Sequence, residues 1–241
     1  TPEDEYYLGR AVAARILAQY PLLTGNPGLA AYLNQICAAL VINSDEPALY
    51  NGYHVSALDS QEFNAFATSG GHILITRGLI AAASSEDALA AVIAHEIAHI
   101  QLRHGVRLVE NLRATDDLSK AAERSSQLAG DELEAEARQT LFDNSVREMA
   151  SGLMTSGYSQ EQEFEADRHA LGLLQKTGYS PSALLDVLKA LEARQASHAG
   201  GFNATHPSPS LRIANVETET GKYAVPDTRT FRSSRFQAVS K

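Results

Sequence analysis

VIAHEIAHIQLRHG, residues 92–105, places two histidines and a glutamate within an otherwise apolar helical stretch. His95 and His99 are four positions apart, so on a helix both imidazoles project from one face and can reach one metal ion. Glu96 lies about 100° around the helix, beside that face. A polar or charged group buried in a core is costly unless a partner satisfies it. The stretch therefore predicts a buried helix that carries a metal site.

Length and composition indicate a globular protein. The 241 residues are 44% hydrophobic, which is enough for a sizeable core. The formal net charge of -9 repels phosphate backbones and anionic lipid, so we expect no nucleic-acid partner. No apolar run approaches the roughly 18 residues of a transmembrane helix, so we expect no membrane-spanning segment. Cys37 is the single cysteine, and its apolar neighbours predict a buried, unpaired thiol.

Periodicity predicts one mostly helical α+β domain over residues 1–241, with a small meander of strands beside the metal-binding helix. The expected parts are N-terminal helices in 1–50, the strand meander in 53–76, the metal-binding helix in 85–104, a helical segment in 106–157, a further helix in 159–178, and C-terminal helices with a tail in 181–241. The helical segment is expected to form either a lid over a cleft or a plain hairpin packed on the domain. The basic end of the chain, 221–241, is expected to be a solvated tail.

Capping residues set the expected ends of the metal-binding helix. Ser84 and Asp87 can form a capping box at its start, and Gly105 stands where a left-handed cap would end it. On one continuous helix, His104 lies about 180° around from His95 and cannot reach the same ion. We therefore expect His104 to face solvent.

Zinc in a catalytic site needs a third protein ligand and one open position for water. The helix expected over 159–178 offers candidates, because Glu163 and Asp167 share its apolar face whereas Glu165 belongs to its polar side. Two inward carboxylates one turn apart repel each other and need a cation or hydrogen-bond donors nearby. The alternative is a pair of core histidines bonded to backbone carbonyls, with no metal.

Four motifs in the same order resemble the zinc metallopeptidases related to the CAAX prenyl endoprotease. They are HEIAH at 95–99, EFEAD at 163–167, NAFATSGGHILITRGL at 64–79 and THPSPSLRI at 205–213. The resemblance spans about residues 50–215. It is greater to the soluble, exported BepA-like branch than to the branches with several membrane spans, HtpX among them, because this chain has no apolar run of that length.

The resemblance implies a fold of the zincin type and a role for each matching residue. His95, His99 and Glu163 would bind one zinc ion, Glu96 would act as the general base, and Asp167 would be a partner of the ligands or a proton donor. The helical positions of these five residues agree with that assignment.

His206 and Arg212 also take expected roles from the resemblance. His206 would lie close to the metal, where it either stabilises the oxyanion or occupies the open zinc position; an ordinary loop histidine is the alternative. Arg212 would anchor that loop through a carboxylate.

The strand HILIT, residues 72–76, is a candidate for substrate binding. It follows a glycine pair and is rich in β-branched residues, so Ile73, Leu74 and Ile75 could lie on an edge strand to which an extended peptide adds. An ordinary sheet strand is the alternative.

Together these features predict a zinc-dependent endopeptidase acting on extended or misfolded polypeptides. Its polypeptide substrate class is implied by the resemblance, as is a location in the cell envelope or periplasm, which the missing initiator methionine also suggests. Alternatives are a zinc-stabilised, chaperone-like binding protein with little proteolysis, and a hydrolase of small amides with a deep closed pocket. No pattern in the sequence predicts the oligomeric state.

Overall fold

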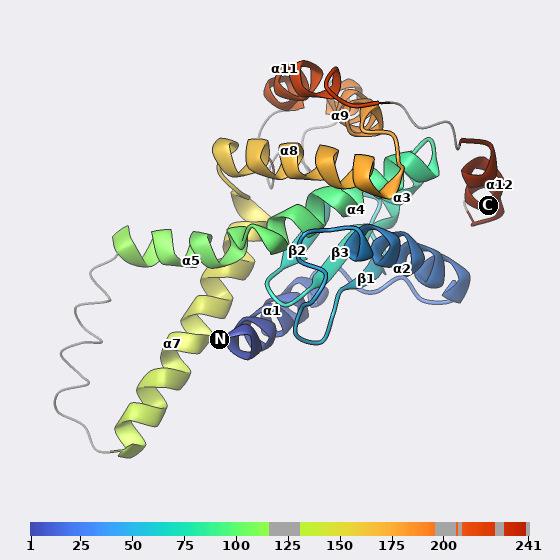
Figure 1. Ribbon diagram of the computed structural model, residues 1–241. Coiled ribbons are helices and arrows are strands. Elements are labelled where there is room, and N and C mark those ends of the chain that lie inside the picture. The colour runs from blue at the N-terminus through green and yellow to red at the C-terminus, as the bar shows by residue number, and fades with distance from the viewer. Residues whose placement is uncertain (116–130, 196–205, 207–208, 225–228, 240–241) are drawn as a thin grey trace.

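The computed structural model describes residues 1–115, 131–195, 206, 209–224 and 229–239 (Figure 1). The helices and strands, in chain order, are α1 (Pro2–Leu17), α2 (Pro27–Ile42), β1 (His54–Leu58), β2 (Ala65–Thr68), β3 (His72–Thr76), α3 (Arg77–Ala82), α4 (Glu86–Gln101), α5 (His104–Thr115), α7 (Asp131–Thr155), α8 (Gln160–Thr177), α9 (Ser182–Gln195), α11 (Pro209–Thr220) and α12 (Arg229–Val239). The predicted fold class, a mostly helical α+β domain with a small sheet, is confirmed.

The three strands form one sheet in the order β1-β3-β2. β1 runs parallel to β3, whereas β2 runs antiparallel to it, so the predicted meander is wrong. The edge position predicted for β3 is also wrong, because β3 is the central strand and has a neighbour on each side. Its continuous apolar run has a simple cause: Leu74 packs on one face of the sheet, and Ile73 and Ile75 pack on the other.

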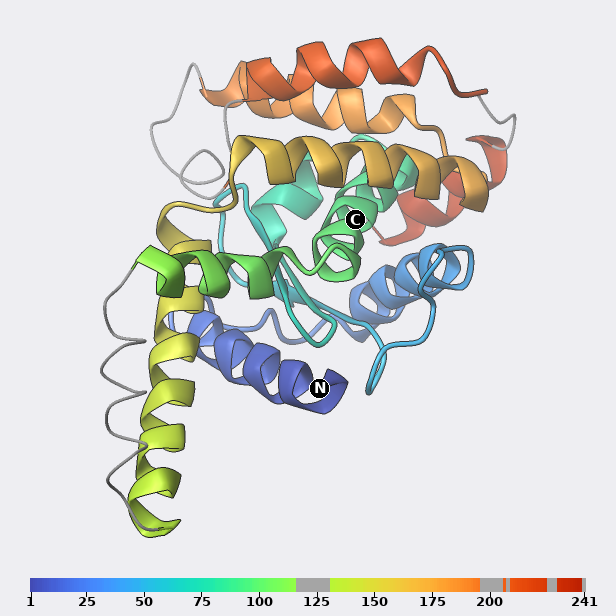
Figure 2. The same cartoon turned by 60° about the vertical axis from the view of Figure 1, so that its left-hand side comes forward.

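Helices cover both faces of this sheet (Figures 1 and 2). One face, with Phe66 and Leu74, packs in a core with α1 and the C-terminal half of α7. The opposite face packs in the larger core with α2 and α4. On the far side of α4 lie α8 and then α9 and α11 (Figure 2). The helix α4 is therefore enclosed between the sheet and α8, and every residue of Glu86–Gln101 is buried.

The ends of α4 differ from those predicted. Ser85, not Ser84, is the N-cap, and its hydroxyl accepts a hydrogen bond from the Ala88 amide. The helix ends at Gln101, because Arg103 takes a left-handed conformation with φ of 56°. The chain then starts α5 at His104, so Gly105 does not act as the cap. Because the helix breaks at Arg103, α5 does not continue the axis of α4.

The segment 106–157 forms parts of two helices, with residues 116–130 outside the described part of the chain. Here α5 and α7 pack against each other, and α7 also packs on α1. Buried side chains on the C-terminal half of α7, such as Val146, Met149 and Leu153, join the core that α1 forms with the sheet. This packing is that of the hairpin alternative; the lid stays an untested prediction.

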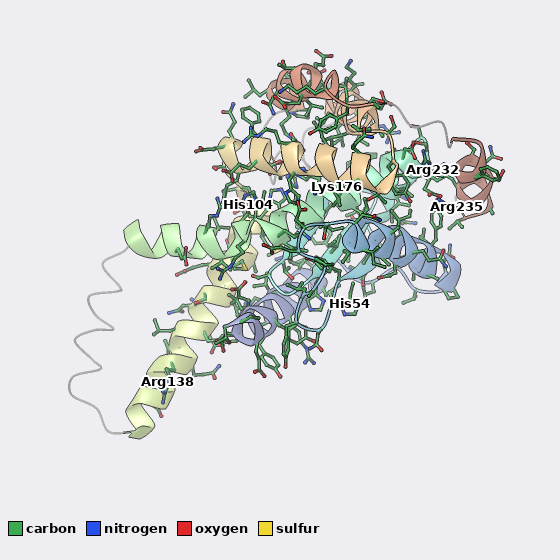
Figure 3. All side chains as sticks on the ribbon, viewed as in Figure 1. His54, His104, Arg138, Lys176, Arg232 and Arg235 are labelled. Atoms are coloured by element: carbon green, nitrogen blue, oxygen red, sulfur yellow. The ribbon has the colours of Figure 1, made fainter. Side chains whose placement is uncertain are left out.

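The predicted solvated tail is wrong for α12, which packs against α2 and α4. Arg232 pairs with Asp87 at 2.7 Å, and Arg235 pairs with Glu86, which also accepts hydrogen bonds from Tyr32 and Tyr179 (Figure 3). Arginines interspersed with apolar residues are compatible with a solvated tail, but here their charges offset the two acids at the start of the buried helix α4. In the part of the chain that the structure describes, no helix has the length and apolarity needed to cross a bilayer. Cys37 is buried, as predicted.

Candidate metal centre

Four buried side chains from distant parts of the chain meet between α4 and α8. His95 and His99 come from α4, Glu163 comes from α8, and His206 lies before α11. One possible ligand atom from each of the four lies within 4.8 Å of the others. We call these residues the four-residue cluster. The three ligands expected from the sequence are thus together, and His206 lies beside them.

The ligand atoms of the cluster point at a common space. The Nε2 atoms of His95 and His99 are 3.0 Å apart, and the carboxylate of Glu163 lies 3.4 Å from the first and 3.5 Å from the second. Nδ1 of His206 lies 2.8 Å from Glu163 Oε1. Two imidazole nitrogens that face each other with a carboxylate between them are the donor set that zinc prefers.

The charges around the cluster also fit a divalent cation. The described residues there include the carboxyl groups of Glu96, Glu163 and Asp167, all at most 1% exposed, and the guanidinium of Arg212. Arg212 lies 2.9 Å from Glu163 and 2.5 Å from Asp167. These three carboxyl groups outnumber the one guanidinium, and a buried carboxylate is costly unless a cation or a proton compensates it. A divalent ion would supply that compensation.

The acidic groups of the cluster respond differently to burial. Burial raises the pKa of Glu163, but His206 and Arg212 oppose it and hold the pKa of this carboxyl well below its usual range. Burial also raises the pKa of Glu96, and here the neighbouring charges do not reverse the rise. Among the described residues, Oε2 of Glu96 has no hydrogen-bond partner. Glu163 thus stays an anion suited to a metal, whereas Glu96 is suited to exchanging a proton.

His95 is held from outside the cluster by Asp167. Nδ1 of His95 lies 3.0 Å from Asp167 Oδ1, and Arg212 donates to both oxygens of the same carboxylate. Burial and Arg212 lower the pKa of His95, but the hydrogen bonds to Asp167 and Glu163 raise that pKa to about 9 without a metal. A carboxylate behind a histidine ligand is the usual way in which proteins orient it.

The prediction that His104 faces solvent is wrong. His104 is fully buried, and its Nδ1 lies 2.8 Å from Nδ1 of His99. Its position lies between α5 and the N-terminal half of α8 (Figure 3). The prediction extended one helix through residue 104, whereas the left-handed residue Arg103 turns the chain back toward α8.

Tyr158 was missed by the sequence analysis. Its ring stacks on His99 with centroids 4.1 Å apart, and its hydroxyl donates a hydrogen bond to the Ala67 carbonyl at 3.3 Å. A signal was available: Tyr158 directly precedes Ser159, which caps α8 as predicted, and an apolar residue in that place commonly packs inward.

The structure also places Arg212 and the strand predicted to bind substrate. Arg212 lies on α11 and bonds Asp167 and Glu163 from there, so it has the carboxylate contact that the resemblance implied. Ile73, Leu74 and Ile75 lie in the buried core of the sheet, on the central strand β3. The strand beside them, β2, is an edge strand instead.

Comparisons with known proteins point in one direction. Residues 27–220 match the family model described as Peptidase family M48. The beta-barrel assembly-enhancing protease of Escherichia coli (strain K12) is 27% identical over 221 residues, which cover 91% of this chain and 44% of that relative. The mitochondrial metalloendopeptidase OMA1 of Schizosaccharomyces pombe is 29% identical over 160 residues, 64% of this chain and 42% of the relative. Metalloprotease LoiP of Escherichia coli is 26% identical over 192 residues, 79% of this chain and 70% of the relative. The chain thus spans less than half the length of the first two relatives.

Proposed function

Because this chain belongs to peptidase family M48, a family of zinc-dependent metalloproteases, we propose that it is a zinc metalloendopeptidase that hydrolyses peptide bonds of extended or misfolded polypeptides. The observation that carries the proposal is the buried four-residue cluster, with an excess of carboxylates around it. His95, His99 and Glu163 would hold the ion.

Glu96 is the general base in this proposal. When bound, zinc lowers the pKa of a water molecule and polarises the carbonyl of the scissile bond. Glu96 accepts the proton of that water and passes it to the leaving amine. Its buried carboxyl group, whose pKa is raised, is suited to both steps, since a general base works best when its pKa approaches the working pH.

His206 occupies the fourth corner of the cluster. One of its possible ligand atoms lies within 4.8 Å of those of the other three residues, which supports the alternative in which His206 fills the position that a catalytic zinc keeps open. In the other alternative, Nε2 of His206 donates a hydrogen bond to the oxyanion while Nδ1 keeps its contact with Glu163. Replacing His206 by Ala distinguishes them: a blocking side chain predicts higher activity of the variant, and an oxyanion donor predicts lower activity.

The edge strand β2 replaces β3 as the proposed docking strand. In the antiparallel pair of β2 and β3, the Thr76 amide donates to Asn64 O, so the backbone groups of Ala65 and Ala67 point away from β3. A cleft of about 460 Å³ is lined by Ala67, His99 and Tyr158. An extended peptide that pairs with β2 along this cleft would run close to the cluster. It would have to replace two bonds that these groups make now, from the Tyr158 hydroxyl to the Ala67 carbonyl and from the Ala65 amide to Asn64.

The cell envelope is the proposed location. It rests on the similarity to beta-barrel assembly-enhancing proteases, which are periplasmic in bacteria. Fractionation of the native host should place the full protein outside the cytoplasm. Recovery in the cytoplasmic fraction would contradict this location without affecting the proposed chemistry.

The test of the chemistry is Glu96→Gln, assayed on denatured casein with and without a chelator. We expect about 10²–10⁴-fold slower cleavage with unchanged zinc content, because the amide cannot accept the proton. Glu161→Gln, an exposed residue on α8, is the matched control and should cleave as wild type does. The pair should also be compared in a His206→Ala background, so that a blocked site does not mask the effect. Equal cleavage with and without Glu96, or no zinc in the wild type, would refute the proposal.

A further inference from the structure

The two ring nitrogens of His99 face different partners. Nε2 points into the four-residue cluster, 3.0 Å from Nε2 of His95 and 3.5 Å from Glu163. Nδ1 points the other way and lies 2.8 Å from Nδ1 of His104. The side of His99 that cannot bind the ion is therefore held by a second histidine rather than by a carboxylate or a backbone carbonyl.

The chain of contacts continues from His104 to the surface. Nε2 of His104 lies 3.2 Å from Oε2 of Glu165, and the same oxygen accepts from Nη1 of Arg107, also at 3.2 Å. His104 is fully buried, whereas Glu165 is partly exposed on the polar side of α8. A line of hydrogen bonds thus joins His99 to an exposed guanidinium.

This line allows one arrangement of protons if His99 binds a metal through Nε2. A neutral imidazole carries one N–H, so a metal-binding Nε2 leaves the hydrogen on Nδ1 of His99. His104 must then accept at Nδ1, which puts its own hydrogen on Nε2, facing Glu165. A doubly protonated His104 would donate at Nδ1 and force the hydrogen of His99 onto the metal side.

The backbone is shaped to bring His104 to this place. Arg103 takes the left-handed conformation, with φ of 56°, which costs about 1–2 kcal/mol for a residue other than glycine. An uninterrupted helix would have carried His104 to the far side of α4. Tyr158 also restrains His99. Its ring stacks on the imidazole with centroids 4.1 Å apart and an interplanar angle of 15°, which limits rotation of the imidazole.

We propose that His104, backed by Glu165, is a positioning residue that fixes the tautomer and orientation of the zinc ligand His99. The inference rests on the proposed function. The two histidine ligands then have different outer partners: Asp167 holds His95, and the imidazole–carboxylate pair holds His99. Such outer partners influence how tightly a metal is bound, so the pair should act on zinc affinity before it acts on catalysis.

The experiment measures zinc affinity by chelator competition and compares thermal unfolding of the zinc-bound and zinc-free protein. His104→Phe keeps a ring of similar size but accepts no hydrogen bond, and we expect it to weaken zinc binding by about 10–100-fold. His104→Asn places an acceptor near the position of Nδ1 and should recover most of that loss. Glu165→Ala leaves both rings in place and should weaken binding less than His104→Phe. Glu161→Gln, also on α8, is the control and should bind zinc as wild type does.

A purely structural role gives a different result. If His104 only filled space, His104→Phe would lower the unfolding temperatures of both forms equally, and the gap between them would not change. Our proposal predicts that the gap narrows, and that the absorption spectrum of the cobalt-substituted protein changes. Wild-type affinity in His104→Phe, or no recovery in His104→Asn, would overturn it. If His104→Phe does not fold, the zinc affinities of His104→Asn and Glu165→Ala test the proposal instead. A zinc affinity of Glu165→Ala at or above that of wild type overturns it. Failure of the wild type to bind zinc would instead overturn the proposed function.

Discussion

Replacing Arg212 by Met tests whether one buried guanidinium holds the metal centre together. Arg212 is 1% exposed and contacts Glu163 at 2.9 Å and Asp167 at 2.9 and 2.5 Å. Methionine fills much of the same space without charge, so both carboxylates lose a partner inside the core. Removing one member of a buried ion pair costs about 3–5 kcal/mol, because the charge left behind is uncompensated.

The expected loss can be converted into a melting temperature. For a chain of this size each kcal/mol lowers the unfolding midpoint by about 2–4 °C, so Arg212→Met should lower it by about 6–20 °C. The comparison should use zinc-free protein, because a bound cation would neutralise part of the charge on Glu163. Urea unfolding, followed by circular dichroism, gives the free energy directly.

Arg77→Met is the matched control. Arg77 pairs with Asp59 at 2.9 Å, the same distance, but both side chains are nearly half exposed. An exposed pair contributes about 0–1 kcal/mol, so this variant should unfold almost as wild type does. If Arg212→Met were no less stable than Arg77→Met, the reasoning from buried charge around the cluster would be wrong.

Other predictions concern parts of the fold away from Arg212. Burial raises the pKa of Glu86, but hydrogen bonds from Arg235 and two tyrosines hold this pKa below its usual value of 4.5. Glu86 therefore stabilises the fold above pH 4.5, and this contribution is lost as the pH falls through the lowered pKa. Urea titration should therefore show that the free energy of unfolding of wild type exceeds that of Glu86→Gln most near neutral pH, and that this excess shrinks below pH 4.5. An excess that does not change with pH would contradict this. Gly9→Ala should destabilise the protein by about 3 kcal/mol, since the added Cβ would lie 1.1 Å from the Ser69 carbonyl oxygen. Gly28→Ala is the control: its Cβ would lie 3.6 Å from the nearest atom, so stability should change by at most about 1 kcal/mol. Chelation should lower the unfolding temperature of the zinc-bound wild type, and equimolar zinc should restore it. Bound zinc should stabilise the fold by about 4 kcal/mol when its concentration is a thousandfold above its dissociation constant. An unchanged unfolding temperature would argue against a resident metal.

Local patterns were enough wherever one element could be considered alone. The helix predicted over 159–178 is α8, and its caps at Ser159 and Gly178 confirm both predicted ends. The spacing within α8 also predicted that Glu163 and Asp167 point inward, and both are fully buried. In each case the deciding interactions join residues within a few positions of one another, so periodicity and capping contain the information.

The failures occurred where distant segments decide the outcome. The apolar run of β3 predicted a strand correctly, but its central place depends on β1 returning parallel to it. His104 was misplaced because one left-handed residue, Arg103, ended α4 early; an arginine carries no local signal for that conformation.

By itself the sequence determined the chemistry available to this protein: two histidines one turn apart on an apolar helix, an inward carboxylate on another helix, and the family to which they belong. Only the tertiary structure decided which groups surround them. The partners of His99 and of Glu163 come from α5, from the loop before α8, from α11 and from His206. The reason is physical: a helix face is set by neighbours a few residues away, whereas the cost of burying a charge is met by any group that the fold brings within hydrogen-bond distance.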